Sequence, residues 1–304
     1  MRPRFTGGPP RRSPGPPRFT GTGPLASAEG VTKQFGELVV VDGVDLTVAA
    51  GEVVGLIGAN GAGKTTLIRM LLGLLAPTAG RVRLFGEPPS RRTRSRLGYM
   101  PQSLGLYEDL TVAENLAFSA AAYGSTDARL EGELAEARDT LVRDLPLGLR
   151  RRAAFAIALA HLPDLLVLDE PTSGVDPLQR ARLWETIRAS AEHGAGVLVT
   201  THHLREAEQC DRLVVLAAGR VVAAGTLAEI VGDTTAAEVR TSSWEAAFTA
   251  LDRAGLPVSL VGRTLRVPAA DPAAVHQLLA AAGVPAEVAQ VPASFEETFV
   301  VLAA

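Results

Sequence analysis

A glycine-rich segment ending in Gly-Lys-Thr constrains the fold of this chain more than any other feature. Residues 58–65 read Gly58-Ala59-Asn60-Gly61-Ala62-Gly63-Lys64-Thr65, which matches the spacing G-x-x-x-x-G-K-[ST]. The apolar run 53–57 before it is typical of a buried strand, and residues 65–75 after it have a helical pattern. Glycines let a backbone curl around phosphate groups, so that several N–H donors and a helix N-terminus face the anion. The sequence therefore predicts a phosphate-binding loop between a strand and a helix.

The end of this loop supplies two side chains suited to a nucleoside triphosphate and its metal. We expect Lys64 to bridge the β- and γ-phosphates of ATP, and the Thr65 hydroxyl to hold Mg²⁺. Lys64 is one of only two lysines in the chain, the other being Lys33. The predicted nucleotide contacts also include Gly58, Asn60, Gly61, Gly63 and Thr66.

An apolar run that ends in two carboxylates predicts a second part of the same site. Residues 165–168 read as a central strand, and Asp169 and Glu170 follow directly. Ligands of open α/β sheets bind at the carboxyl ends of the strands. We expect Asp169 to orient Mg²⁺ through water and Glu170 to take a proton from the attacking water. Alone, the pattern also fits a buried strand that ends at a polar turn; beside the phosphate loop it predicts nucleotide hydrolysis.

The order of helical and strand-like runs predicts an α/β core with two additions. Residues 26–83 read as strands with a turn at Asp42-Gly43, and residues 97–232 alternate helices and strands, as a mostly parallel sheet does. Residues 111–160 are almost wholly helical in pattern, which indicates a helical insertion. Residues 235–304 read β-α-β-β-α-β, the order of a ferredoxin-like unit, with Asp271 capping its second helix.

Composition limits the remaining parts of the chain and their partners. Residues 1–24 are rich in Pro, Gly and Arg, which predicts a disordered tail rather than a signal peptide; the alternative is that its arginines contact anionic lipid. No run reaches the roughly 18–20 apolar residues of a spanning helix, so a membrane-spanning partner would be a separate chain. The net charge of -3 gives no basic field for nucleic acid. The single cysteine, Cys210, fits a reducing compartment.

These motifs, in this order, resemble those of the ABC-type ATPases over roughly residues 28–230. The resemblance implies a P-loop NTPase core. The run 169–177 is similar to the family's magnesium strand leading into its D-loop, in which Asp176 would contact the opposite subunit of a nucleotide-sandwich dimer. Phe35 matches the aromatic residue that stacks on adenine in that family.

Two further motifs of the family carry residues that would act on the γ-phosphate. Thr200-Thr201-His202 resembles the switch histidine motif, which implies that His202, rather than His203, reaches the γ-phosphate. Tyr99-Met100-Pro101-Gln102 resembles the Q-loop. The resemblance implies that Gln102 touches Mg²⁺ and the attacking water, and that it links the helical insertion to the membrane partner.

The chain departs from the family at the signature sequence, which is usually Leu-Ser-Gly-Gly-Gln. Residues 145–149 read Leu-Pro-Leu-Gly-Leu, so Pro146 replaces the serine that normally bonds the γ-phosphate in the opposite subunit, and Leu147 replaces a glycine. Proline supplies no such donor, although it suits the start of a helix, and Gly148 still permits one close backbone approach. This form resembles one found in a subset of ABC-2 type exporter ATPases. We expect a working but altered contact between subunits; the alternative is a dead half-site paired with a different, intact subunit.

Three arginines follow in the first turn of that helix, where cations oppose the helix dipole. Arg150-Arg151-Arg152 could therefore face an anion, but a plain solvated face is the preferred interpretation.

Composition, element order and the resemblance together divide the chain into three parts, and the resemblance implies one leading function. The parts are a tail at 1–25, an ATPase domain at 26–233 with its helical subdomain at about 103–160, and an accessory domain at 234–304, whose run 294–299 resembles the C-terminal extensions of ABC-2 type ATPases. The function implied is ATP hydrolysis by two copies that drive export through a separate ABC-2 type permease. The protein would then be cytoplasmic and peripheral on the inner face of the cell membrane.

Two alternatives belong to other functional classes. One is a soluble ABC protein that acts on ribosomes or DNA. The chain has neither a second cassette nor the sustained heptads of long coiled coils, which disfavours this class. The other is a nucleotide-binding regulator that barely hydrolyses ATP. Pro146 argues for this regulator, and Glu170 and His202 argue against it.

Overall fold

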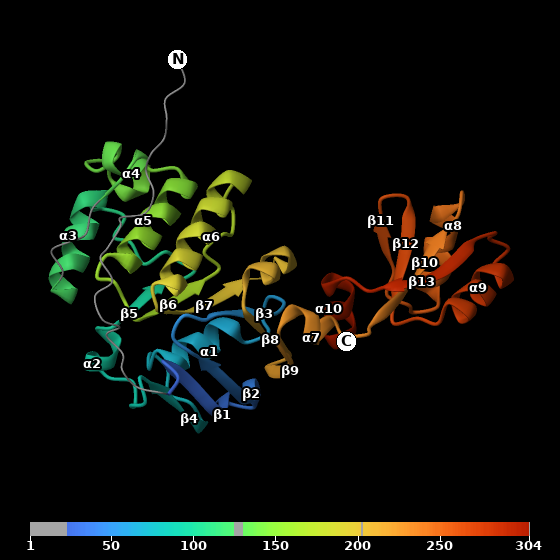
Figure 1. The fold of residues 1–304 in the computed structure, drawn as a ribbon, viewed down its shortest axis with the longest axis horizontal. Coiled ribbons are helices and arrows are strands. Elements are labelled where there is room, and N and C mark those ends of the chain that lie inside the picture. Colours follow the sequence, from blue (N-terminus) through green and yellow to red (C-terminus); the bar gives the residue numbers. More distant parts are fainter. Residues whose placement is uncertain (1–22, 125–129, 202, 304) are drawn as a thin grey trace, which may run out of the picture. The chain divides into compact units, whose positions relative to one another are not determined.

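The computed structural model describes residues 23–124, 130–201 and 203–303 (Figure 1). The predicted tail at 1–25 lies, apart from its last three residues, outside the described residues. The chain divides into two compact units between Val221 and Val222, and each unit is described by itself. The predicted division between residues 233 and 234 stays a prediction.

The first unit opens with an antiparallel sheet of three strands in the order β2-β1-β4. These are β1 (Ala26–Phe35), β2 (Leu38–Val48) and β4 (Ala79–Leu84). The turn predicted at Asp42-Gly43 is wrong, because both residues lie inside β2 and the chain turns at Gly36 instead. Gly43 has φ of 60°, and the β1–β2 register shifts beside it. A glycine with positive φ thus serves a bulge here, not a hairpin.

A six-stranded sheet in the order β5-β6-β7-β3-β8-β9 forms the centre of the unit. Its strands are β3 (Val53–Ile57), β5 (Leu97–Met100), β6 (Leu165–Asp169), β7 (Gly196–Thr201), β8 (Arg212–Ala217) and β9 (Arg220–Gly225). The pairings of β5 with β6, β6 with β7, β7 with β3 and β3 with β8 are parallel. All residues of β3, β6 and β7 are buried, as expected for strands covered on both faces.

Helices cover the two faces of this sheet (Figure 1). On one face, α1 (Lys64–Leu71) shares an apolar core with β3, β6 and the antiparallel sheet. On the other face, α5 (Leu147–Leu159) and α6 (Pro177–Glu192) share a second core with the same strands. Successive residues of β6 alternate between the cores, so that Leu165 and Val167 belong to the first and Leu166 and Leu168 to the second.

The predicted helical insertion consists mainly of α3 (Val112–Tyr123) and α5, with short turns between them. The turns are α4 (Glu133–Glu136) and the 3₁₀ helix η1 (Val142–Asp144). Pro146 is the N-cap of α5, as predicted. Two other short elements complete the unit, α2 (Arg91–Arg94) and the 3₁₀ helix η2 (Leu204–Gln209).

The second unit confirms the predicted ferredoxin-like order. After α7 (Leu227–Val231), the elements are β10 (Thr235–Arg240), α8 (Trp244–Arg253), β11 (Ser259–Val261), β12 (Thr264–Pro268), α9 (Pro272–Ala281), β13 (Glu287–Pro292) and α10 (Phe295–Ala303). The strands form an antiparallel sheet in the order β11-β12-β10-β13. Asp271 caps α9 by accepting a hydrogen bond from the Ala273 amide at 3.1 Å.

A partly buried ion pair joins α10 to the sheet of this unit. Arg266 donates from Nε to Glu297 Oε1 at 2.8 Å and from Nη2 to Glu297 Oε2 at 2.9 Å, and its Nη1 lies 3.4 Å from Glu238 Oε2. Burial alone would raise the pKa of Glu297, but the hydrogen bonds from Arg266 and the Ser294 amide outweigh it and lower that pKa. The pair therefore stabilises the unit most when Glu297 is ionised.

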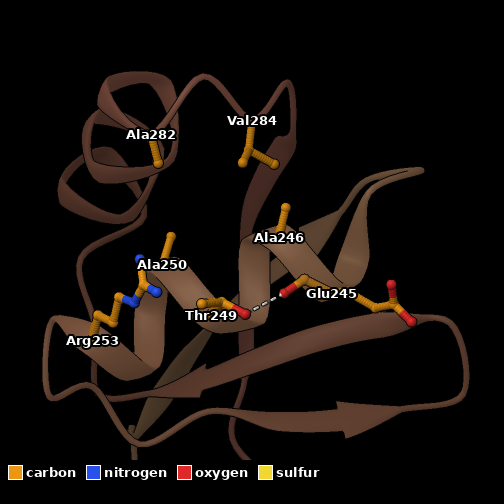
Figure 2. A pocket seen from close by; sticks show the side chains of 7 residues that line it. All are labelled: Glu245, Ala246, Thr249, Ala250, Arg253, Ala282 and Val284. Atoms are coloured by element: carbon orange, nitrogen blue, oxygen red, sulfur yellow. Dashed lines mark hydrogen bonds between the residues drawn. The ribbon is translucent and has the colours of Figure 1, made fainter.

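A shallow hollow of about 360 Å³ lies on this unit (Figure 2). Glu245, Thr249 and Arg253 of α8 line one side of it, and Ala282 and Val284 line the other. The Thr249 hydroxyl already donates to the Glu245 carbonyl at 2.8 Å. None of the polar side chains that line the hollow is buried, so it provides no built ligand site.

None of the helices in the described ranges combines the length and the apolar character that crossing a membrane requires.

Candidate active site

The phosphate loop leaves β3 after Ile57 and ends where α1 begins, at Lys64. Gly61 and Gly63 have backbone φ angles of 83° and 101°, values that residues with a Cβ rarely adopt. A Cβ added to Gly63 would lie 2.7 Å from the Val40 carbonyl oxygen, and one on Gly58 would lie 2.5 Å from that of Leu216. Gly63 is therefore required by close packing as well as by conformation, Gly58 by close packing and Gly61 by conformation. The predicted strand, loop and helix are confirmed, although α1 ends at Leu71 rather than Leu75.

Lys64 is buried inside the loop that precedes it. Its Nζ donates to the carbonyl oxygens of Gly58 at 2.7 Å and Ala59 at 3.0 Å. Burial lowers the pKa of Lys64, and the charges of Glu170 and Asp169 oppose that shift. The ammonium group is thus fixed at the loop whose shape suits phosphate.

Asp169 joins three elements of the site at the end of β6. Its Oδ2 accepts a hydrogen bond from Thr65 Oγ1 at 2.9 Å, and its Oδ1 accepts one from Thr200 Oγ1 at 2.7 Å. Asp169 is 1% exposed. Hydroxyl and carboxylate oxygens are the ligands that hard cations prefer, so the predicted pair of Thr65 and Asp169 fits Mg²⁺.

Glu170 follows Asp169, and both its backbone amide and its backbone carbonyl form hydrogen bonds with side chains. Its amide donates to Thr200 Oγ1 at 2.9 Å, and its carbonyl oxygen accepts from Arg151 Nη1 at 2.9 Å. Its φ is 52°, in the left-handed region. Gln102 Nε2 lies 3.4 Å from Glu170 Oε2, so the structure brings these two predicted residues together.

Arg151 is a part of this site that the sequence analysis missed. The preferred interpretation of residues 150–152 as a solvated face is wrong for Arg151, which is 8% exposed. Arg150 and Arg152 do lie on the surface side of α5, near Glu108 and Glu133. Arg151 shares the buried face with Ala154, Phe155 and Ala158. This spacing of i, i+3, i+4 and i+7 was visible in the sequence and could have indicated its burial.

The residues predicted to act across a dimer lie on α5 and α6. Gly148 is in the first turn of α5, where an added Cβ would meet nothing within 4 Å. Asp176 caps α6, accepting from the amides of Leu178 at 3.0 Å and Gln179 at 3.1 Å. Leu147 packs beside Gly174, 3.3 Å from where a Cβ of that glycine would be. The signature segment and the D-loop-like segment are therefore neighbours, and neither Gly148 nor Asp176 makes any of the contacts described for Lys64, Asp169 and Glu170.

Of three further predicted residues, two lie in described elements. Phe35 ends β1 and is 49% exposed, with Lys33 Nζ 4.9 Å from its ring centroid. Thr66 lies in the first turn of α1. His202 lies outside the described residues; before it, β7 ends at Thr201.

Comparisons with known proteins agree on one family. The family model for ABC transporter matches residues 41–173. The Nod factor export ATP-binding protein I of Ralstonia nicotianae is 43% identical over 231 residues, which cover 72% of this chain and 71% of that protein. The probable multidrug ABC transporter ATP-binding protein YbhF of Escherichia coli is 41% identical over 214 residues, 66% of this chain but only 37% of that protein.

Solved structures show the same relationship. An ATP-binding subunit of an ABC transporter superposes with a TM-score of 0.64 at 33% identity, over 68% of this chain and 91% of that one. The arrangement of phosphate loop, sheet and helical insertion is thus that of a known ATPase cassette. The chain belongs to the ABC transporter ATP-binding family.

Proposed function

We propose that this chain binds and hydrolyses ATP and thereby drives export through a separate membrane permease. The observation that carries the proposal is that Lys64, Thr65, Asp169 and Glu170 lie together at the carboxyl ends of β3 and β6, the two parallel strands on either side of β7. The relatives named above as export and multidrug transporter subunits support the direction of transport. We assign the activity to residues 26–233, with the helical subdomain at about 103–160, and treat residues 234–304 as an accessory domain.

ATP would bind through the phosphate loop. The backbone of Gly58, Asn60, Gly61 and Gly63 and the N-terminus of α1, including Thr66, face the phosphates, while Lys64 contacts the β- and γ-phosphates. The half-exposed ring of Phe35 offers a face on which adenine stacks.

Three residues suit the Mg²⁺ that accompanies ATP. Thr65 would bind it directly, Asp169 through water, and Gln102 from the Q-loop. Among the described residues, no three His, Cys, Asp or Glu side chains cluster so as to hold a metal. A site of this kind takes its other oxygens from phosphates and water. The ion would neutralise charge on the phosphate oxygens.

Glu170 is the proposed general base for the attacking water. Gln102, 3.4 Å from its carboxylate, would orient that water, and His202 would contact the γ-phosphate. Such reactions proceed by positioning and charge stabilisation rather than by a covalent intermediate.

A second ATPase subunit would complete each site. The first turn of α5, with Gly148, and Asp176 at the start of α6 would reach the nucleotide of the opposite subunit. A homodimer is the proposed state, and a heterodimer with an intact partner is the alternative. The permease would be of the ABC-2 type and would hold the ATPase at the inner, cytoplasmic face of the cell membrane.

ATP hydrolysis by the purified chain tests this function. Lys64→Ala and Glu170→Gln are expected to abolish turnover, while Glu192→Gln, a change of the same type on the exposed side of α6, keeps it. The permease in lipid is expected to stimulate turnover. If ATP binds but no condition gives hydrolysis, the chain is instead a regulatory or half-site subunit.

A further inference from the structure

The guanidinium of Arg151 is not on the surface of the protein. It packs against the backbone of Glu170, the proposed general base. Its Nη1 donates to the Glu170 carbonyl oxygen at 2.9 Å, and the side chain is buried. Burial lowers the pKa of Arg151, against the opposing charge of Glu170. Burying a cation in this way is costly unless it contacts a polar group, so this hydrogen bond is a specific feature of the site.

The contact acts on a residue whose backbone is strained. Glu170 has φ of 52°, a conformation that a residue with a Cβ seldom keeps unless its surroundings hold it. Thr200 Oγ1 holds the amide side of Glu170. Arg151 holds the carbonyl side at 2.9 Å, and the Ser173 amide donates to the same oxygen at the longer distance of 3.3 Å. Relaxation to a negative φ would turn the Glu170 side chain away from Gln102 and the phosphate loop.

Arg151 also belongs to the helix that begins with the altered signature. It follows Pro146, the N-cap of α5, by five residues and thus lies in the second turn. A helix moves largely as a rigid body, so a shift of its first turn also shifts Arg151 relative to Glu170. The first turn of α5, proposed to meet the opposite nucleotide, is thus connected to the general base of its own subunit through one turn of helix and one hydrogen bond.

We propose that Arg151 is a positioning residue, which holds Glu170 in its left-handed conformation and links the first turn of α5 to ATP hydrolysis in the same subunit. This inference rests on the proposed ATPase function. It concerns turnover and not nucleotide affinity, because Arg151 contacts Glu170 and not the phosphate loop.

The test compares Arg151→Met, Arg151→Lys and the control Arg152→Met in steady-state hydrolysis. Arg151→Met keeps the aliphatic stem and removes the donor, and we expect kcat to fall about tenfold or more, with KM and the Kd of a fluorescent ATP analogue within about twofold. Arg151→Lys, which restores a cationic donor, is expected to recover most of kcat. Arg152→Met removes a surface ion pair with Glu133 and is expected to keep kcat.

Two results would overturn the proposal. One is an Arg151→Met enzyme whose kcat equals that of Arg152→Met. The other is a loss of kcat that Arg151→Lys does not restore and that comes with equal losses of ATP affinity and melting temperature, as expected of a purely structural arginine. If the unmodified chain binds ATP without hydrolysing it, the proposed function fails first, and this outcome is distinct from both.

Discussion

Thr200 offers the sharpest test of how the site is held together. Its buried hydroxyl accepts from the Glu170 amide at 2.9 Å and donates to Asp169 Oδ1 at 2.7 Å. Thr200→Val keeps the shape and the strand preference of the side chain but removes both bonds. A neutral bond contributes about 1 kcal/mol and one to a charged group about 2 kcal/mol, so the free energy of unfolding should fall by about 3 kcal/mol.

The adjacent residue provides a matched control. Thr201 is equally buried in the same strand, but its hydroxyl accepts one bond, from the His203 amide at 2.9 Å. Thr201→Val should therefore cost about 1 kcal/mol. For a urea m-value of about 2 kcal/mol/M, the midpoints should fall by about 1.5 M for Thr200→Val and about 0.5 M for Thr201→Val.

Urea unfolding without nucleotide or divalent cation measures the difference. The two tryptophans, Trp184 and Trp244, lie in different units, so a Trp244→Phe background lets Trp184 report on the first unit. Equal midpoint shifts for the two threonine variants would refute the bonding described for Thr200. An unchanged Thr200→Val midpoint would refute it more strongly.

Three further predictions concern other parts of the molecule. Arg266→Met should destabilise the second unit by about 3 kcal/mol by leaving Glu297 buried without its partner, seen as faster amide exchange in β10; unchanged exchange would contradict this. Because the pKa of Glu297 is lowered on folding, its stabilisation is complete above the unfolded pKa and is lost as pH falls through the lower, folded one. The protection factors of the β10 amides, which correct for the slower intrinsic exchange in acid, should therefore decrease as pH falls in the unmodified chain, and less so in Arg266→Met. Asp176→Ala should cost about 1 kcal/mol by removing the α6 cap, measured by urea unfolding; a midpoint equal to that of the unmodified chain would exclude a capping role.

Local patterns were enough to predict the parts of the site that form within one segment. The phosphate loop follows from glycine geometry and a strand–helix context, and the carboxylates of residues 169–170 follow from a strand that ends in polar residues. The ferredoxin-like order of the second unit followed in the same way. Each of these depends on neighbours in the chain, which sequence patterns record directly.

Three features that depend on distant contacts were not predicted from local patterns. The dipeptide Asp42-Gly43 is compatible with a turn and with a β-bulge. The pairing of β2 with β1 is what makes it a bulge. From the sequence, Arg151 was interpreted as a surface cation. Only the packing of α5 against the end of β6 brings it to its partner, the Glu170 carbonyl. The threonine hydroxyl that joins Asp169 to Glu170 comes from a strand thirty residues further on, and no local pattern marks it.

ATP-driven association of the Glu170→Gln chain is the most direct test of the proposed motor. Light scattering should give the mass of two chains with ATP and Mg²⁺, and the mass of one chain with ADP or with EDTA. Lys64→Ala in the same background should remain a single chain in every condition. If Glu170→Gln binds ATP and yet keeps the mass of one chain, with or without the permease, the altered signature does not close over a second nucleotide and the proposed two-subunit mechanism is wrong.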